Sequence, residues 1–143
     1  MAQVFARRGY NIAALVVSPS VNQRFSRMTI TAIGDPGTLD QIIKQCSKLI
    51  DVLHVSKHAH ENAIEVELAL LKIKYKPSIK APILKIIKRF HAHVIDTTDS
   101  SMIIEQTGTT ERLDEFESLV KKYGIVEMVR TGKVVMARGR EPT

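Results

Sequence analysis

The sequence predicts an α+β fold built from two small units that share one order of elements. In both halves, segments whose polarity alternates with a period of two are interleaved with apolar stripes at helical spacing. The chain has 143 residues, of which 44% are hydrophobic and 25% charged, a composition typical of globular domains. A polar linker over residues 57–62 separates the halves, so we expect domains over 1–58 and 62–143.

The first half is predicted to contain helix, strand, strand, helix and strand in that order. Gly9 is expected to end the opening helix, because glycine takes the left-handed cap position without a Cβ clash. Thr38 follows a Gly-Asp-Pro-Gly turn and is expected to cap the second helix. The expected elements are a helix over 2–8, strands over 11–18 and 25–33, a helix over 39–49 and a strand over 51–56.

The second half is predicted to contain strand, helix, strand, strand, helix and strand, which is a split βαβ or ferredoxin-like unit. Gly124 is expected to end its second helix. The first half follows the same pattern without an opening strand, as an N-terminal truncation would produce. The expected elements are strands over 64–75, 93–97, 102–107 and 125–130 (extended by 134–137), and helices over 77–91 and 109–123.

Composition also bounds where the chain functions. No apolar run approaches the roughly 20 residues that span a bilayer, and the N-terminus lacks a signal-peptide pattern, so we expect a soluble, internal protein. Cys46 is the only cysteine, which excludes an intrachain disulfide. Because it lies in an apolar helical stripe, we interpret it as a buried structural thiol.

Sites for catalysis and metal binding are weakly indicated. His54, His58 and His60 are close in sequence, but their spacing is not that of a metal site, and we expect no bound metal. No serine lies in a nucleophile elbow. Glu65 and Glu67 point to one face of a strand, either as paired carboxylates or as a solvated or subunit-contacting face.

The basic charge leaves nucleic-acid binding open as an alternative. The net charge is +6 and the isoelectric point about 9.6. The lysines alternate or follow helical spacing, which favours solvated faces. RNA-recognition sheets stack bases on strand aromatics, whereas Tyr75 is the only strand aromatic of the second half.

Ordered motifs along nearly the whole chain resemble the regulatory subunits of acetolactate (acetohydroxyacid) synthase. Each motif alone is weak, but their ordered set is specific. The similar stretches are Phe5-Ala-Arg-Arg-Gly-Tyr-Asn-Ile12, Ser26-Arg-Met-Thr-Ile30, Gln41-Ile-Ile-Lys-Gln45, Lys48-Leu-Ile-Asp-Val-Leu-His-Val55, Glu65-Val-Glu-Leu-Ala-Leu-Leu-Lys72, Phe90, Ile95-Asp96, Thr107-Gly108 and Val129-Arg-Thr-Gly132.

This resemblance implies two ACT-type units in a protein that is not itself a catalyst. In this family the N-terminal ACT domains pair as a homodimer and bind a branched-chain amino acid, usually valine, at their interface. The dimer binds a separate catalytic subunit that carries thiamine diphosphate, magnesium and FAD. It activates that subunit, which converts two pyruvates to 2-acetolactate and CO2 in valine and isoleucine biosynthesis, and confers feedback inhibition.

The resemblance also implies effector-binding residues and a compartment. Asn11 matches the family's effector-contacting asparagine, and Ile12 follows it at the pocket wall. An asparagine amide can donate to a carboxylate and accept from an ammonium group. The expected location is the bacterial cytoplasm or the plastid stroma. Another ACT-type amino-acid-sensing module and an RNA-binding ferredoxin-like protein are the alternatives.

Overall fold

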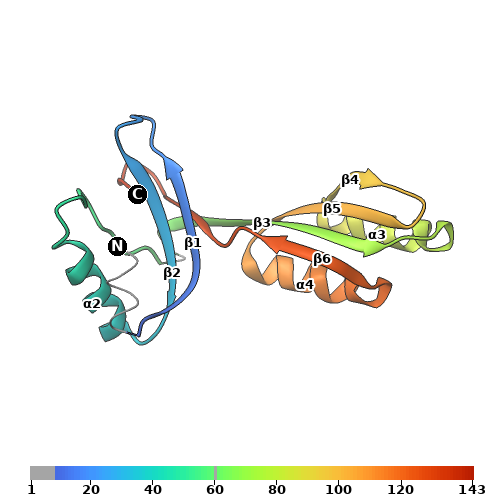
Figure 1. The fold of residues 1–143 in the computed structure, drawn as a ribbon, viewed down its shortest axis with the longest axis horizontal. Helices are drawn as coiled ribbons and strands as arrows, with labels where there is room; N and C mark the ends of the chain where they lie inside the picture. The colour runs from blue at the N-terminus through green and yellow to red at the C-terminus, as the bar shows by residue number, and fades with distance from the viewer. Residues whose placement is uncertain (1–8, 60) are drawn as a thin grey trace. The chain divides into compact units, whose positions relative to one another are not determined.

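The computed structural model describes residues 9–59 and 61–143, and Figure 1 shows their ribbon. The described chain separates into two compact units. Unit 1 comprises the residues up to Ile64 together with Val134–Thr143, and unit 2 comprises Glu65–Lys133. The helix expected over 2–8, and His60, lie outside the described residues.

Unit 1 is built around an antiparallel hairpin and one helix. Strand β1 (Asn11–Pro19) pairs with β2 (Ser26–Ile33), and helix α2 (Pro36–Cys46) follows. One end of the hairpin packs on the apolar stripe of α2. The helix buries only two of its side chains fully. The cluster consists of Ile42 and Cys46 with the partly buried Tyr10, Ile12, Ile30, Ala32, Leu39 and Val55.

The start of α2 corrects one expectation. Asp35, not Thr38, caps the helix: its carboxylate accepts a hydrogen bond from the Thr38 backbone N–H at 2.7 Å. A carboxylate satisfies an otherwise unpaired N–H and also favours the positive end of the helix dipole. The helix therefore begins at Pro36, where proline is tolerated because its missing N–H has no partner to lose.

The prediction of a strand over 51–56 was wrong. After a turn at Asp51 the chain runs without regular secondary structure through Ala59. Val55 still packs against the cluster on α2, so the apolar pattern reflects burial and not sheet pairing. A strand needs a neighbour for its backbone groups, and β2 pairs only with β1 within the described residues.

Unit 2 contains an antiparallel sheet in the order β4-β5-β3-β6, whereas β7, which pairs with β3, belongs to unit 1. Helices α3 and α4 lie against one face of this sheet (Figure 1). The two 3₁₀ turns η1 and η2 lie before α3 and after α4. The bounds are β3 Ala63–Lys74, η1 Pro77–Ile79, α3 Lys80–Phe90, β4 His93–Thr97, β5 Ser101–Gly108, α4 Thr110–Val120, η2 Lys121–Tyr123, β6 Ile125–Arg130 and β7 Val134–Ala137.

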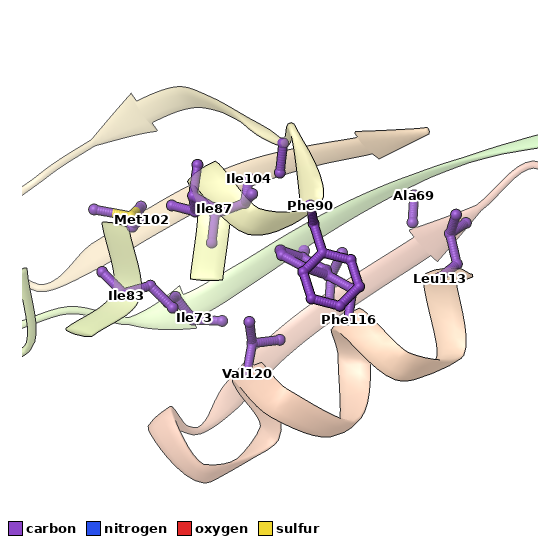
Figure 2. Packing of buried hydrophobic residues seen from close by; sticks show 12 residues of the cluster. Ala69, Ile73, Ile83, Ile87, Phe90, Met102, Ile104, Leu113, Phe116 and Val120 are labelled. Atoms are coloured by element: carbon purple, nitrogen blue, oxygen red, sulfur yellow. The ribbon is translucent and has the colours of Figure 1, made fainter. Parts of the chain in front are cut away.

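The core of unit 2 lies between the sheet and its two helices. Alternate residues of β3 and β5 point into it, as the pleat requires. Figure 2 shows side chains from both strands and both helices converging there. Phe116 is fully buried and meets Phe90 edge to face, with ring centroids 5.3 Å apart. This is the element order predicted for the second half, and the α+β fold class is confirmed.

Candidate effector site and charged groups

The predicted effector residues lie where the chain enters β1. Gly9 has a φ of 65°, in the left-handed region that favours glycine, and Tyr10 follows it. Asn11 begins the strand and is paired with Ile33 of β2. Its side chain is exposed and makes no hydrogen bond to another described residue. The amide is therefore available to a ligand.

Ile12 has a different environment from its neighbour. Successive residues of a strand point to opposite faces, and Ile12 is half-buried against the Ile42 and Cys46 side chains. The hairpin places Ile12 directly opposite Ala32. Ile12 thus anchors the start of β1 to unit 1's own core, whereas Asn11 faces outward. Their assignment to an effector site stays a prediction.

Cys46 is buried as predicted, with 3% of its surface exposed. Burial raises the pKa of its thiol, since the thiolate is poorly solvated there. A thiol that is buried and protonated is a poor nucleophile. Its place in the α2 cluster accounts for it as a packing residue.

The two glutamates of β3 are neither solvated nor free. Glu65 forms an ion pair with Lys133 at 2.9 Å, and the nearly buried Glu67 pairs with Arg130. Alternation placed them correctly on one face, but it could not show that their partners lie 68 and 63 residues later, just after and at the end of β6. These carboxylates are engaged in structural ion pairs, which argues against a general acid–base pair.

Arg130 is the hub of this network. Its guanidinium contacts Glu67 on β3, Asp114 on α4 and, more distantly, Glu117 at 3.8 Å. Partial burial works against the charged form, but the hydrogen bonds and charges of Asp114 and Glu67 outweigh it and raise the pKa of Arg130. The arginine therefore ties α4 to the sheet. Sequence reasoning noted it only as part of a motif.

The histidines within the described residues do not converge on a metal site. His58 shares a 2.9 Å hydrogen bond with Ser56, and His93 lies 3.8 Å from Glu105. Across residues 9–59 and 61–143, no group of three or more His, Cys, Asp or Glu side chains could hold a metal ion. Nor does any helix in this part of the chain have the length and apolar character to cross a membrane.

Both halves of the chain match family models. Residues 66–139 match the family described as the small subunit of acetolactate synthase. Residues 1–54 match the ACT domain described as acetohydroxyacid synthase small subunit-like. The two matches follow each other in the order that the sequence motifs indicated.

Individual relatives agree along nearly the full length. The chain is 39% identical to a probable acetolactate synthase small subunit of Archaeoglobus fulgidus, over 99% of this chain and 88% of that protein. It is 41% identical to the acetolactate synthase small subunit of Aquifex aeolicus, over 96% of this chain and 72% of the relative.

A solved structure shows the same fold. The crystal structure of the acetolactate synthase small subunit from Thermotoga maritima superposes with a TM-score of 0.89 and 35% sequence identity. The match covers 98% of this chain and 88% of that one. Taken with the family models and the relatives, this similarity shows that the chain belongs to the family of acetolactate synthase small subunits.

Proposed function

We propose that this chain is the non-catalytic regulatory subunit of acetolactate synthase. The observation that carries the proposal is the ordered match of both halves to the small-subunit family. In this role the chain binds and activates a catalytic subunit that holds thiamine diphosphate, magnesium and FAD. That subunit forms 2-acetolactate and CO2 from two pyruvates, in the bacterial cytoplasm or the plastid stroma.

Feedback inhibition by valine follows if the effector binds one state of the complex better than another. An effector changes an equilibrium only by its differential affinity for the two states. The exposed Asn11 amide supports a contact to the charged groups of an amino acid, because it offers both a donor and an acceptor. The neighbouring Ile12 supports the site by fixing β1 on the core.

The effector site is proposed to be completed by pairing of two N-terminal ACT domains. Leu15 and Val17 of β1 are 52% and 54% exposed. Neighbouring exposed aliphatic side chains on one face of a strand form an apolar patch, and such patches often mark protein interaction sites. Their exposure supports a homodimer through unit 1.

The RNA-binding alternative gains no support. Tyr75, the aromatic expected to lie in a strand and to be able to stack on a base, lies just after β3, is partly buried and packs against the core of unit 2. Another ACT-type sensor would share the fold, but would not bind the catalytic subunit.

Reconstitution tests the proposal. The purified chain is mixed with the catalytic subunit from the same source, and acetolactate formation is followed with and without valine. We expect stimulation that valine reverses. Absence of both stimulation and a complex on size-exclusion chromatography would refute the regulatory role.

A substitution tests the effector residue separately. Asn11→Ala should leave stimulation unchanged and raise the valine concentration for half-inhibition about tenfold or more, as loss of a hydrogen bond to a charged group does. Asn22→Ala, in the exposed turn of the same hairpin, is the control. Equal valine sensitivity in both variants would remove Asn11 from the site.

A further inference from the structure

Unpaired lysines gather at one end of unit 2, which we call the basic end: Lys74, Lys76, Lys80, Lys121 and Lys122. Backbone hydrogen bonds join the segments that carry them. The Lys74 N–H donates to the Gly124 carbonyl at 2.9 Å, and the Gly124 N–H donates to the Lys121 carbonyl at 3.0 Å. Figure 1 shows the end of β3 beside the turn between α4 and β6.

In the described part of the chain, the basic end gathers five lysines without an ion-pair partner, whereas outside it in unit 2 Lys85 and Lys88 of α3 are also unpaired but several other cations are paired. Within the described residues, none of its five lysines has an ion-pair partner, and all five are exposed. Elsewhere in the unit several cations are engaged. Lys72 pairs with Glu127, Arg89 with Glu115, Arg130 with Glu67 and Asp114, and Lys133 with Glu65, while Arg112 lies over the Phe90 ring.

Local stability does not explain the positive charge at this end. Lys80 lies in the first turn of α3, which has neither an acidic residue nor a side-chain cap. A cation there opposes the helix dipole and costs roughly 0.3–1 kcal/mol. Two acidic residues lie close in sequence to this end: Asp99, in the turn before β5, and Glu117, one helical turn before Lys121, but among the described residues no ion pair joins either to the five lysines. Uncompensated like charges of this kind fit an anionic surface outside the chain.

An apolar residue and two covered aromatics favour protein over nucleic acid as that surface. Val126 is 57% exposed at a bulge in β6, close to Gly124. Tyr75 and Tyr123 are partly buried against the core, and the Lys122 ammonium covers the Tyr123 ring at 5.1 Å. A basic rim beside an apolar side chain is typical of a protein interface, whereas single-stranded nucleic acid requires open stacking platforms.

We propose that the basic end docks on an acidic patch of the catalytic subunit. The inference rests on the proposed function, because that function names the partner. Exposed charges of this kind steer association and make it sensitive to salt. Stimulation at low ionic strength therefore depends on the basic end more than stimulation at high ionic strength does.

The test compares two triple variants of equal charge change. Lys76→Glu, Lys80→Glu and Lys121→Glu reverse the basic end at positions without a side-chain partner. Lys48→Glu, Lys85→Glu and Lys88→Glu reverse exposed, unpaired lysines elsewhere. Circular dichroism and size-exclusion chromatography establish that both variants are folded. The measured quantity is the subunit concentration that gives half-maximal stimulation, at about 0.05 M and about 0.5 M NaCl.

We expect the basic-end variant to require about tenfold more subunit at low salt, with a smaller difference at high salt. The control variant should stay close to the unmodified chain. Equal behaviour of the two variants would overturn the inference while leaving the proposed function intact. If the unmodified chain itself fails to stimulate, the proposed function falls and the named partner with it. Unchanged stimulation with selective loss of affinity for a single-stranded RNA oligonucleotide would replace the protein partner by nucleic acid.

Discussion

Arg130 shows how one residue can hold an element in place. Its guanidinium joins β6 to β3 and to α4 through carboxylates, one of which, Glu67, is 7% exposed. Removing the cation would leave a nearly buried carboxylate without compensation, which costs more than the ion pair itself contributes. The network is thus a point of vulnerability in unit 2.

Arg130→Met is therefore expected to lower the free energy of unfolding by about 2–4 kcal/mol. Arg89→Met is the control, because its pair with Glu115 is exposed and such pairs contribute about 1 kcal/mol or less. Urea denaturation of both variants measures the difference. Similar losses in the two would show that the Glu67 carboxylate is solvated without Arg130.

The Asp35 carboxylate at the start of α2 should make the stability of the fold depend on pH. Hydrogen bonds from the Thr38 backbone N–H and side chain lower the pKa of Asp35 in the folded state below its ordinary value of 3.8. The folded pKa lies below the unfolded one, so the stabilisation is present above the unfolded pKa and is lost as the pH falls through the folded pKa.

The comparison that isolates this effect is Asp35→Asn, since asparagine accepts the same hydrogen bond but does not titrate. We expect the stability of the unmodified chain relative to this variant to fall between about pH 5 and the folded pKa. Urea midpoints at several pH values measure it. Parallel pH profiles would exclude Asp35 as the titrating group.

The site residues illustrate what sequence can predict at this scale. The glycine at position 9 and the strand pattern after it correctly predicted that Asn11 is the first residue of a strand. The packing of Ile12 against Ile42 and Cys46 could not be predicted, because it depends on which hairpin face the helix covers. Likewise, Glu65 and Glu67 showed their common face but not their partners.

At the scale of elements, local patterns predicted unit 2 well. Its strands alternate, its helices carry apolar stripes, and Gly124 ends the second helical segment with a φ of 84°. The segment 51–56 has an equally strand-like composition but lacks a pairing neighbour within the described residues. Strand formation depends on a partner as well as on composition, so this part of unit 1 could not be predicted from its own residues.

Helix α4 depends on one fully buried aromatic side chain. Phe116 packs against Phe90 and the sheet (Figure 2), and truncation leaves a cavity that close-packed neighbours fill only partly. We expect Phe116→Ala to lower the free energy of unfolding by about 3–5 kcal/mol. Chemical denaturation measures this, with the 56% exposed Ile95→Ala as the control. A loss as small as that of the control would mean that α4 repacks.

The whole chain offers a direct measure of effector binding. A ligand that binds only the folded protein stabilises it according to its concentration, by about 2.7 kcal/mol at one hundred times Kd. We expect valine to raise Tm progressively, and Asn11→Ala to shift this increase to about tenfold higher valine concentrations or more. Leucine and alanine in parallel define specificity. A Tm independent of valine would place effector binding in the complex alone.

Charge is the whole-molecule property that sequence described least well. The net charge of +6 was visible, and alternating lysines indicated solvated faces. Which lysines are paired depends on contacts such as Lys72 with Glu127, 55 residues apart. The basic end becomes visible only when the paired cations are set aside, which requires the fold.

The single, buried cysteine makes opening of unit 1 measurable by thiol labelling. Cys46 reacts with a thiol reagent only after α2 has moved away from the hairpin, since its side chain is enclosed there. No other thiol competes for the reagent. The labelling rate therefore counts openings of unit 1 without an added probe. A ligand that stabilises the closed form of this unit should lower the labelling rate of Cys46, and this can be measured without the catalytic subunit.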